Sequence, residues 1–279
     1  MGANKENKIN VKNIIKESAV VLVLVAIIIV FSFLSPQFFK ISNFITILRQ
    51  ISILAIVSVG MTVVLISGGI DLSVGFIISV VSVLTAMSAV YGKMPTGVAI
   101  VIGLLLGTFM GLINGVMITM TGMPPMIGTL ATQMIFRGLG FIVSDGASVY
   151  HLPNGFKIFG QGYAGPVPVP VLIMVIILAI FAFILGRTYI GRYFYAVGSN
   201  AEATRLCGLN TQKIQILAYM LCGFLSAIGG IIMTSRVNSG QPKAGDGYEM
   251  DVLTACVVGG ISINGGEGKI RHIVVGVLI

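Results

Sequence analysis

The sequence predicts an all-α integral membrane protein, a polytopic helical bundle of about 8–10 transmembrane helices, some of them broken. Of its 279 residues, 56% are hydrophobic and only 9% are charged, whereas about 25% are charged in an ordinary globular chain. So few charged residues cannot cover a surface that faces water, and lipid is therefore the expected solvent. The apolar runs are continuous rather than alternating, which favours helices over the strands of a barrel.

Eight apolar stretches are candidate spans, and most approach the roughly 20 residues needed to cross about 30 Å of hydrocarbon. The first is longer than the apolar region of a signal peptide, so we expect it to be retained. The last is too short to cross regularly and predicts a broken or partly re-entrant helix. The chain ends inside a further apolar stretch, which indicates a final span that is cut off at the C-terminus. The candidate spans are residues 18–37, 45–67, 73–91, 95–121, 125–143, 167–186, 214–234 and 252–263.

The distribution of basic residues predicts the orientation in the membrane. Residues 1–17 are rich in lysine, and loops with an excess of Lys and Arg stay in the cytoplasm. Residues 186–213 follow after six spans and carry four basic residues against one acid, so parity and charge both put them inside. Residues 145–166 and 235–251 then lie outside. We expect a multi-pass membrane protein, with a cytoplasmic segment 1–17 and one membrane domain, 18–279.

The segment Ser67-Gly-Gly-Ile-Asp-Leu-Ser-Val-Gly75 interrupts two apolar runs. Its two glycines followed by Asp71 and Ser73 predict a broken helix whose second half begins with capping side chains. A half-helix inside a membrane often presents polar groups to a substrate. An interfacial turn with an ordinary N-cap is the alternative. A similar sequence pattern at residues 256–266 hints at an internal repeat.

Gly103, Gly107, Gly111 and Gly115 recur every four residues and so lie on one face of the fourth span. Such a stripe allows two backbones to approach closely in a membrane. It predicts a tight helix contact, either inside the subunit or near a dimer seam. Asn114, beside the stripe, could bond across this contact or face a substrate pathway.

Arg137 lies well inside the fifth span, where a charge is costly and is usually paired or functional. It could bond backbone carbonyls or Asp71, or contact a substrate. We take Asp71, Ser73, Asn114 and Arg137 as candidate pathway or gate residues. Asp71 is the single acid expected within the membrane, which argues against a carrier driven by protons through a relay of acids.

The stretch from Gly198 to Gly208 lies in the basic cytoplasmic loop 186–213. An N-cap at Ser199 or Asn200 and a stop at Gly208 predict a short helix of about two turns. This helix could lie on the membrane or dock into a partner.

Several function classes find no support in the residues. Residues 265–270 resemble a phosphate loop but lack its spacing, and Lys269 is followed by Ile270 rather than Ser or Thr, so ATP binding by this chain is not expected. We find no Ser-His-Asp arrangement, no metal-ligand spacing and no aromatic-interleaved basic patch for nucleic acid. We therefore expect no enzyme activity, cofactor or metal. Three dispersed cysteines are interpreted as packing residues.

The chain resembles the ABC-importer permeases of the ribose, xylose, galactose and autoinducer-2 group from about residue 44 onward. The resemblance rests on four segments: GGIDLSVG at 68–75, NGVMI…MPPMIGTLATQMIFRGL within 114–139, GRYFYAVGSNAEATRLCGLN at 191–210, and GYEMDVLTACVVGGISINGGEGK at 247–269.

The resemblance implies the transmembrane permease subunit of an ATP-driven importer for a monosaccharide. The expected partners are a cytoplasmic ABC ATPase, an extracytoplasmic sugar-binding protein, a second permease copy or sibling, and membrane lipid. It also makes the loop 186–213 similar to the coupling loop that contacts the ATPase, although Cys207 stands where such loops often carry serine. The coupling positions that it implies are Gly191, Gly198, Asn200, Glu202, Ala203 and Gly208.

Two alternatives stay open. A permease of the same class could carry branched-chain amino acids or nucleosides, whose permeases have a related texture. An ion-coupled secondary carrier working alone would need more ionisable groups in the membrane than the sequence provides.

Overall fold

The computed structural model describes residues 24–26, 28–34 and 38–279. The predicted cytoplasmic segment 1–17 lies outside the described residues, as does part of the first candidate span. Residues 24–26 and 28–34 of that span are helical.

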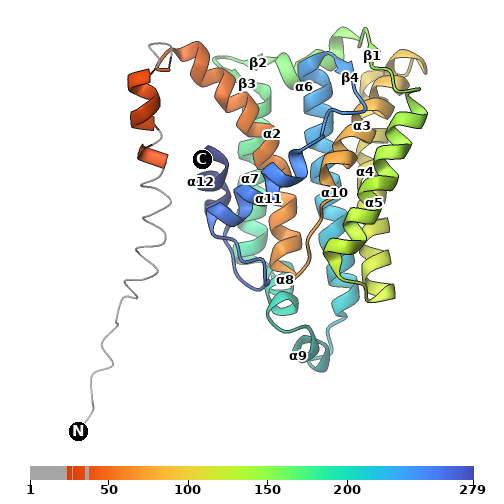
Figure 1. Ribbon diagram of the computed structural model, residues 1–279, viewed down its shortest axis with the longest axis vertical. Helices are drawn as coiled ribbons and strands as arrows, with labels where there is room; N and C mark the ends of the chain where they lie inside the picture. The colour runs from red at the N-terminus through yellow and green to blue at the C-terminus, as the bar shows by residue number, and fades with distance from the viewer. Residues whose placement is uncertain (1–23, 27, 35–37) are drawn as a thin grey trace.

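The remaining described chain forms eleven helices and two pairs of two-residue strands (Figure 1). In chain order the elements are α2 (Ile41–Ile66), α3 (Val74–Val90), α4 (Thr96–Thr121), α5 (Pro125–Val143), β1 (Val149–Tyr150), α6 (Asn154–Gln161), β2 (Tyr163–Ala164), β3 (Val167–Pro168), α7 (Val169–Arg187), α8 (Tyr189–Ser199), α9 (Ala201–Leu206), α10 (Thr211–Val237), β4 (Ser239–Gly240), α11 (Tyr248–Gly259) and α12 (Ile270–Leu278).

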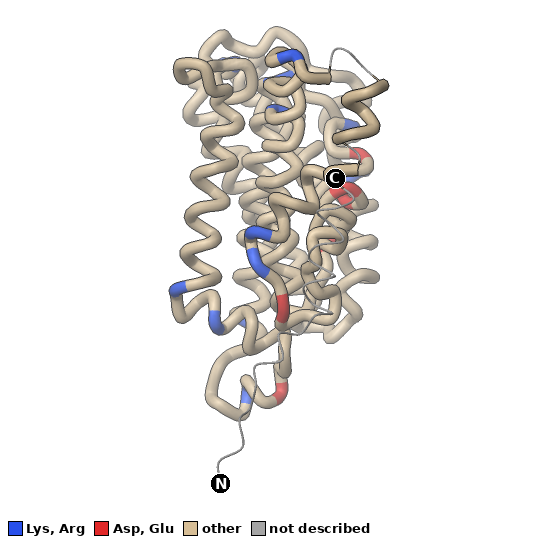
Figure 2. The backbone as a smooth tube through the Cα atoms, turned by 90° about the vertical axis from the view of Figure 1, so that its left-hand side faces the viewer, with Lys and Arg blue, Asp and Glu red and all other residues tan. Residues whose placement is uncertain are grey.

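The prediction of an all-α polytopic membrane protein is confirmed. Among the described residues five helices are long and apolar enough to cross a bilayer: α2, α4, α5, α7 and α10. Helix α3 is apolar but has only 17 residues, because it begins after a break rather than at a membrane surface. Figure 2 shows long stretches of these helices without a charged residue, as hydrocarbon requires.

Helix α10 lies at the centre of the bundle and contacts α2, α3, α4 and α6. Small residues allow these close approaches. A Cβ added at Gly60 of α2 would come within 2.9 Å of the Cα of Cys222 in α10, and one added at Gly230 of α10 would come within 2.9 Å of the Ile78 carbonyl oxygen in α3. Association without a hydrophobic driving force depends on such backbone proximity.

The second half of α2 is surrounded by protein on all sides. From Ala55 to Ile66 every residue of the helix is buried, and it packs against α7, α10, α11 and α12. A helix that is apolar around its whole circumference is expected in such a position. The second half of α2 is therefore part of the buried core up to Ile66, where the chain breaks.

The two ends of the bundle differ. At one end β1 pairs with β4 and β2 with β3, both antiparallel, and α6 lies beside them; the opposite end carries α8 and α9 (Figure 1). The sequence reading did not predict the strand pairs or α6. Gly160 of α6 donates its N–H to Ser235 Oγ at 2.7 Å, which joins α6 to the end of α10.

Helix α11 has only 12 residues, and the residue that follows it and caps it is Gly260, whose φ of 99° requires glycine. The expected broken helix near residues 252–263 is thus present, although it begins and ends earlier. The chain then returns as α12, which packs against α11. Gly276 of α12 lies so close to Ala255 that an added Cβ would overlap the Ala255 carbonyl oxygen.

Candidate functional site

A buried polar cluster occupies the connection between α2 and α3. The Oδ1 atom of Asp71 accepts hydrogen bonds from the backbone N–H of Ser73 at 3.0 Å and from the Ser73 hydroxyl at 2.6 Å. The Ser73 hydroxyl therefore satisfies Asp71 instead of capping an N–H group of α3, as a simple N-cap would. Both side chains are completely buried.

Asn114 of α4 completes this cluster across a helix contact. Its Nδ2 donates to Ser73 Oγ at 2.7 Å and to Asp71 Oδ1 at 3.3 Å. Asn114 is also completely buried, so it bonds across the contact instead of opening onto a cavity in this conformation. Three of the four predicted pathway residues therefore form one network that fastens the α2–α3 break to α4.

Arg137, the fourth predicted residue, lies elsewhere. Its guanidinium stands over the ring of Phe76 in α3, with its carbon 5.5 Å from the ring centroid, and its side chain is exposed on the surface of the described chain. The structure does not bring Arg137 together with Asp71. A charge inside a span is costly in hydrocarbon, and the Phe76 ring offers this one a cation–π contact.

A second buried polar pair was missed in the sequence. Gln133 of α5 donates its Nε2 to Glu249 Oε1 of α11 at 3.0 Å, and each residue is only 7% exposed. Gly75, at the start of α3, lies so close to Glu249 that an added Cβ would overlap Oε2. The sequence reading placed Glu249 in an outer loop. The spacing of Glu249, Val252 and Cys256 on one helical face was the signal that could have revealed it.

The predicted glycine stripe of α4 lies against α10 of the same chain. A Cβ at Gly107 would come within 2.6 Å of the Ala227 Cβ, and one at Gly115 within 2.8 Å of the Ile216 Cα. At Gly111 an added Cβ would overlap the Tyr219 carbonyl oxygen. Gly103 faces Thr85 of α3 as well as α10. The stripe therefore forms the seam between α4 and α10.

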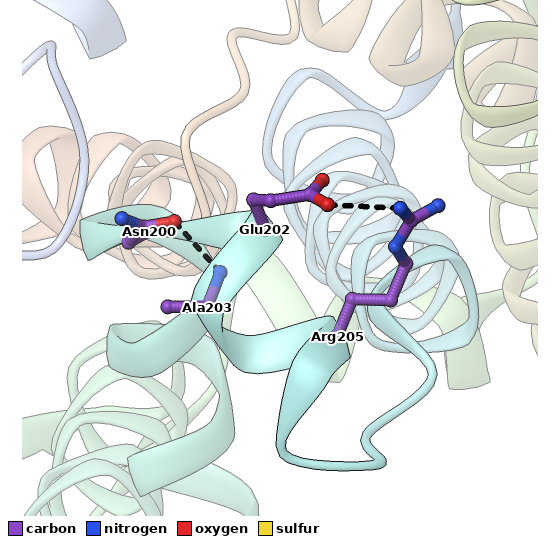
Figure 3. A network of polar contacts seen from close by, with 4 residues as sticks. All are labelled: Asn200, Glu202, Ala203 and Arg205. Atoms are coloured by element: carbon purple, nitrogen blue, oxygen red, sulfur yellow. Dashed lines mark hydrogen bonds and ion pairs between the residues drawn. The ribbon is translucent and has the colours of Figure 1, made fainter.

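The predicted cytoplasmic loop contains two helices instead of one. Helix α8 begins at Tyr189, where the Thr188 hydroxyl accepts from the N–H of Gly191 at 3.2 Å, and it includes Ser199. Asn200 is then the N-cap of α9, since its Oδ1 accepts from the Ala203 N–H at 2.8 Å (Figure 3). Helix α9 (Ala201–Leu206) thus has the predicted N-cap and close to the predicted length of about two turns, and α8 before it is the helix that was not predicted.

Helix α9 turns most of its side chains outward. Glu202 and Arg205 form an ion pair of 2.9 Å, with both side chains exposed (Figure 3). Leu206 is 80% exposed, and only Thr204 is buried. Gly208 follows with φ of 85°, a left-handed conformation that ends the helix. This tip is therefore available to a partner.

A junction of three segments connects α8 to the α2–α3 break. The N–H of Gly266 donates to the Ile66 carbonyl oxygen at 2.9 Å. A Cβ at Gly198 of α8 would overlap the same carbonyl oxygen, and one at Gly265 would come within 3.0 Å of the Gly68 Cα. We call these residues (Ile66, Gly68, Gly198, Gly265 and Gly266) the glycine junction. The four glycines lack side chains, and this is what allows the three backbones to meet.

Tyr195 fastens the glycine junction from the side of α8. Its hydroxyl donates to the Gly268 carbonyl oxygen at 2.7 Å. Partial burial raises the pKa of the Tyr195 phenol above its ordinary value, so the hydroxyl stays protonated and keeps this bond at physiological pH. Gly198, near the end of α8, thus belongs to the glycine junction, and Asn200, two residues later, caps α9.

Comparisons with known proteins agree with this architecture. The profile of the family described as "Branched-chain amino acid transport system / permease component" matches residues 43–279. The ribose import permease protein RbsC of Bacillus subtilis is 40% identical over 277 residues, covering 99% of this chain and 86% of that protein. The L-arabinose transport system permease protein AraH of Escherichia coli is 39% identical over 231 residues, covering 82% of this chain and 70% of AraH. The D-allose transport system permease protein AlsC of the same species is 32% identical over 258 residues, covering 92% and 79%. No solved structure shows significant similarity.

Proposed function

The chain belongs to the family of branched-chain amino acid transport system permease components, and from this premise we propose that it is the membrane-spanning permease subunit of an ATP-driven importer for a monosaccharide. The observation that carries the proposal is the 40% identity to a ribose import permease across 99% of the chain. The described helices suit a multi-pass protein whose role is transport rather than catalysis.

The relatives favour a sugar as the cargo. The family description mentions branched-chain amino acids, but the relatives reported above are permeases for ribose, L-arabinose and D-allose. All three are small aldoses with several hydroxyl groups. The cargo of this chain is therefore a pentose or hexose in our proposal.

ATP hydrolysis is assigned to a separate ATPase that grips the loop 186–213 in the cytoplasm. The exposed tip around Glu202, Arg205 and Leu206 supports this assignment, because an apolar side chain that is 80% exposed suits a protein partner. Gly191, Gly198, Asn200, Ala203 and Gly208 shape the backbone that presents this tip. Residues 1–17 are assigned to the same, cytoplasmic side of a bacterial plasma (inner) membrane.

The opposite end, with α6 and the strand pairs, is assigned to a sugar-binding protein outside the cell. A second permease copy or a sibling completes the pathway. In this scheme the cluster of Asp71, Ser73 and Asn114 is part of the gate, since its hydrogen bonds hold the α2–α3 break against α4. The glycine junction links that break to the ATPase side.

Reconstitution with the cognate ATPase and binding protein tests both the transport and its coupling. The wild-type complex is expected to accumulate a sugar in proteoliposomes only with ATP. Gly198→Ala inserts a methyl group against the Ile66 carbonyl oxygen and should lower the sugar transported per ATP hydrolysed by about 2- to 30-fold, the range of coupling changes of about 0.5–2 kcal/mol.

The matched control is Gly186→Ala in the last turn of α7, where an added Cβ meets nothing within 4 Å. This variant should keep the wild-type ratio of sugar to ATP. Equal ratios in the two variants would contradict a role of the glycine junction in coupling, and ATP-independent uptake by the wild type would contradict the importer itself.

The native cysteines test the proposed orientation. Cys207 is exposed at the end of α9, whereas Cys222 and Cys256 are completely buried. A membrane-impermeant maleimide should therefore label Cys207 in inside-out vesicles and leave intact cells or right-side-out vesicles unlabelled. Cys207→Ser should abolish the labelling. Labelling of Cys207 in intact cells would put α9 outside and refute the orientation.

A further inference from the structure

The buried pair of Gln133 and Glu249 carries an unused capacity for hydrogen bonding. One bond joins Gln133 Nε2 to Glu249 Oε1, but Gln133 Oε1 and Glu249 Oε2 have no hydrogen-bond partner among the described residues. Both side chains are more than nine-tenths buried. A buried acceptor without a donor is costly, and a native site that retains two of them calls for a ligand that supplies donors.

The pair lies one helical turn from an exposed charge on α5. Arg137 follows Gln133 by one helical turn on α5 and is exposed. It stands six residues before Val143, which puts it about 9 Å inside the span at about 1.5 Å per residue. Asp251 and Thr254 of α11 are exposed as well, at other positions around that helix. A charged side chain at this depth is costly in hydrocarbon, and we take this side of α5 and α11 as the one that borders the transport passage.

The chemistry of the pair selects the ligand. Two acceptor oxygens from a carboxyl and an amide, held together by their own hydrogen bond, can each accept an O–H group. Adjacent hydroxyl groups of a sugar offer two such donors. Gly75 supports the arrangement, because any side chain there would displace the Glu249 carboxyl group. An apolar cargo has no donor for these oxygens.

We infer that Glu249 and Gln133 form a hydroxyl-recognition point in the passage, at which the sugar donates hydrogen bonds to Glu249 Oε2 and Gln133 Oε1 while it crosses. This inference rests on the proposed function and adds to it a specific contact with the cargo. It assigns to α11, the short broken helix, the task of presenting the acidic half of the contact.

The test uses the reconstituted complex with its ATPase and binding protein, supplied with whichever of ribose, arabinose and allose the wild type carries. Monodeoxy analogues of that sugar that the binding protein accepts are measured in parallel. Glu249→Gln keeps the size of the side chain but changes the acceptor. It should lower uptake of the parent sugar about tenfold, the effect of roughly one hydrogen bond to a charged group. Uptake of the analogue that lacks the recognised hydroxyl should change less than twofold.

Gln133→Met should also lower uptake of the parent sugar, and it should change uptake of the same analogue by less than twofold. The matched control is Thr234→Val, which removes a different buried helix–helix hydrogen bond, that from Thr234 to Ser82 at 2.7 Å. If this control lowers uptake at all, it should lower the parent sugar and all analogues by one common factor. The fraction of assembled complex, measured by size-exclusion chromatography, normalises each rate.

Each outcome decides the matter. A loss that is specific to the parent sugar supports the recognition point. An equal loss for the parent sugar and every analogue, or no loss in Glu249→Gln, would overturn it while leaving the importer proposal intact. Failure of the wild-type complex to take up any pentose or hexose with ATP would instead refute the proposed function, and it would be seen before any variant is compared.

Discussion

Replacing Asp71 with leucine is expected to prevent the chain from folding stably. The substitution leaves the Ser73 N–H without its acceptor and deprives the Asn114–Ser73 pair of the group that orients it. The Ser73 N–H and the Ser73 hydroxyl both lose their acceptor. At about 1–3 kcal/mol for each unsatisfied buried group, these two groups together cost about 2–6 kcal/mol. Unfolding by SDS in mixed micelles, followed by circular dichroism, would measure the loss.

Asp71→Asn is the matched control for this prediction. An asparagine has nearly the same shape and keeps one oxygen that can accept from Ser73, so the loss in the free energy of unfolding should be much smaller than in Asp71→Leu. If both variants were equally unstable, the negative charge would matter more than the hydrogen bonds. If Asp71→Leu were as stable as the wild type, the network of Asp71, Ser73 and Asn114 would not hold the break together.

The second large effect is expected at the seam between α4 and α10. Gly111→Ala puts a methyl group where the Tyr219 carbonyl oxygen lies, and a backbone atom cannot move aside as a flexible side chain can. Overpacking of this kind costs about 1–3 kcal/mol. The same SDS titration should therefore show Gly111→Ala unfolding at a lower SDS fraction than the wild type.

Gly97→Ala in the same helix serves as the control, since an added Cβ there meets nothing within 4 Å. Alanine is also the better helix former, by about 1 kcal/mol in the interior of a helix, so this variant should be at least as stable as the wild type. A Gly111→Ala protein that matched Gly97→Ala would mean that α4 and α10 can separate without penalty.

The helical spans could be predicted from the sequence because lipid imposes a simple local rule. In lipid, an apolar stretch of sufficient length must make all its backbone hydrogen bonds within itself, as a helix does. Helices α4, α5, α7 and α10 follow from that rule. The glycine stripe could likewise be read from its spacing on one helix. What the spacing could not reveal is its partner, because no local pattern in residues 103–115 refers to α10.

The polar contacts were harder to predict for the same reason. Asn114 is 43 residues from Asp71 in the chain, and their bond depends on how α4 crosses the α2–α3 connection. Glu249 was assigned to a loop because it stands at the start of a helix that is too short for the usual length criterion. The glycine junction gathers residues near positions 66, 198 and 266, and only the folded backbone shows why glycine is required at these points.

The enclosure of α2 has a consequence for the order in which the protein can mature. During synthesis α2 leaves the ribosome well before α7, α10, α11 and α12, the helices that finally surround it. Its C-terminal half is therefore in contact with lipid first, and these contacts are replaced by contacts with the later helices once those are made. Its apolar sequence permits this, but Asp71 has to wait in the bilayer for Asn114 to be translated. The nascent chain thus passes through a stage in which Asp71 relies on Ser73 alone for its hydrogen bonds.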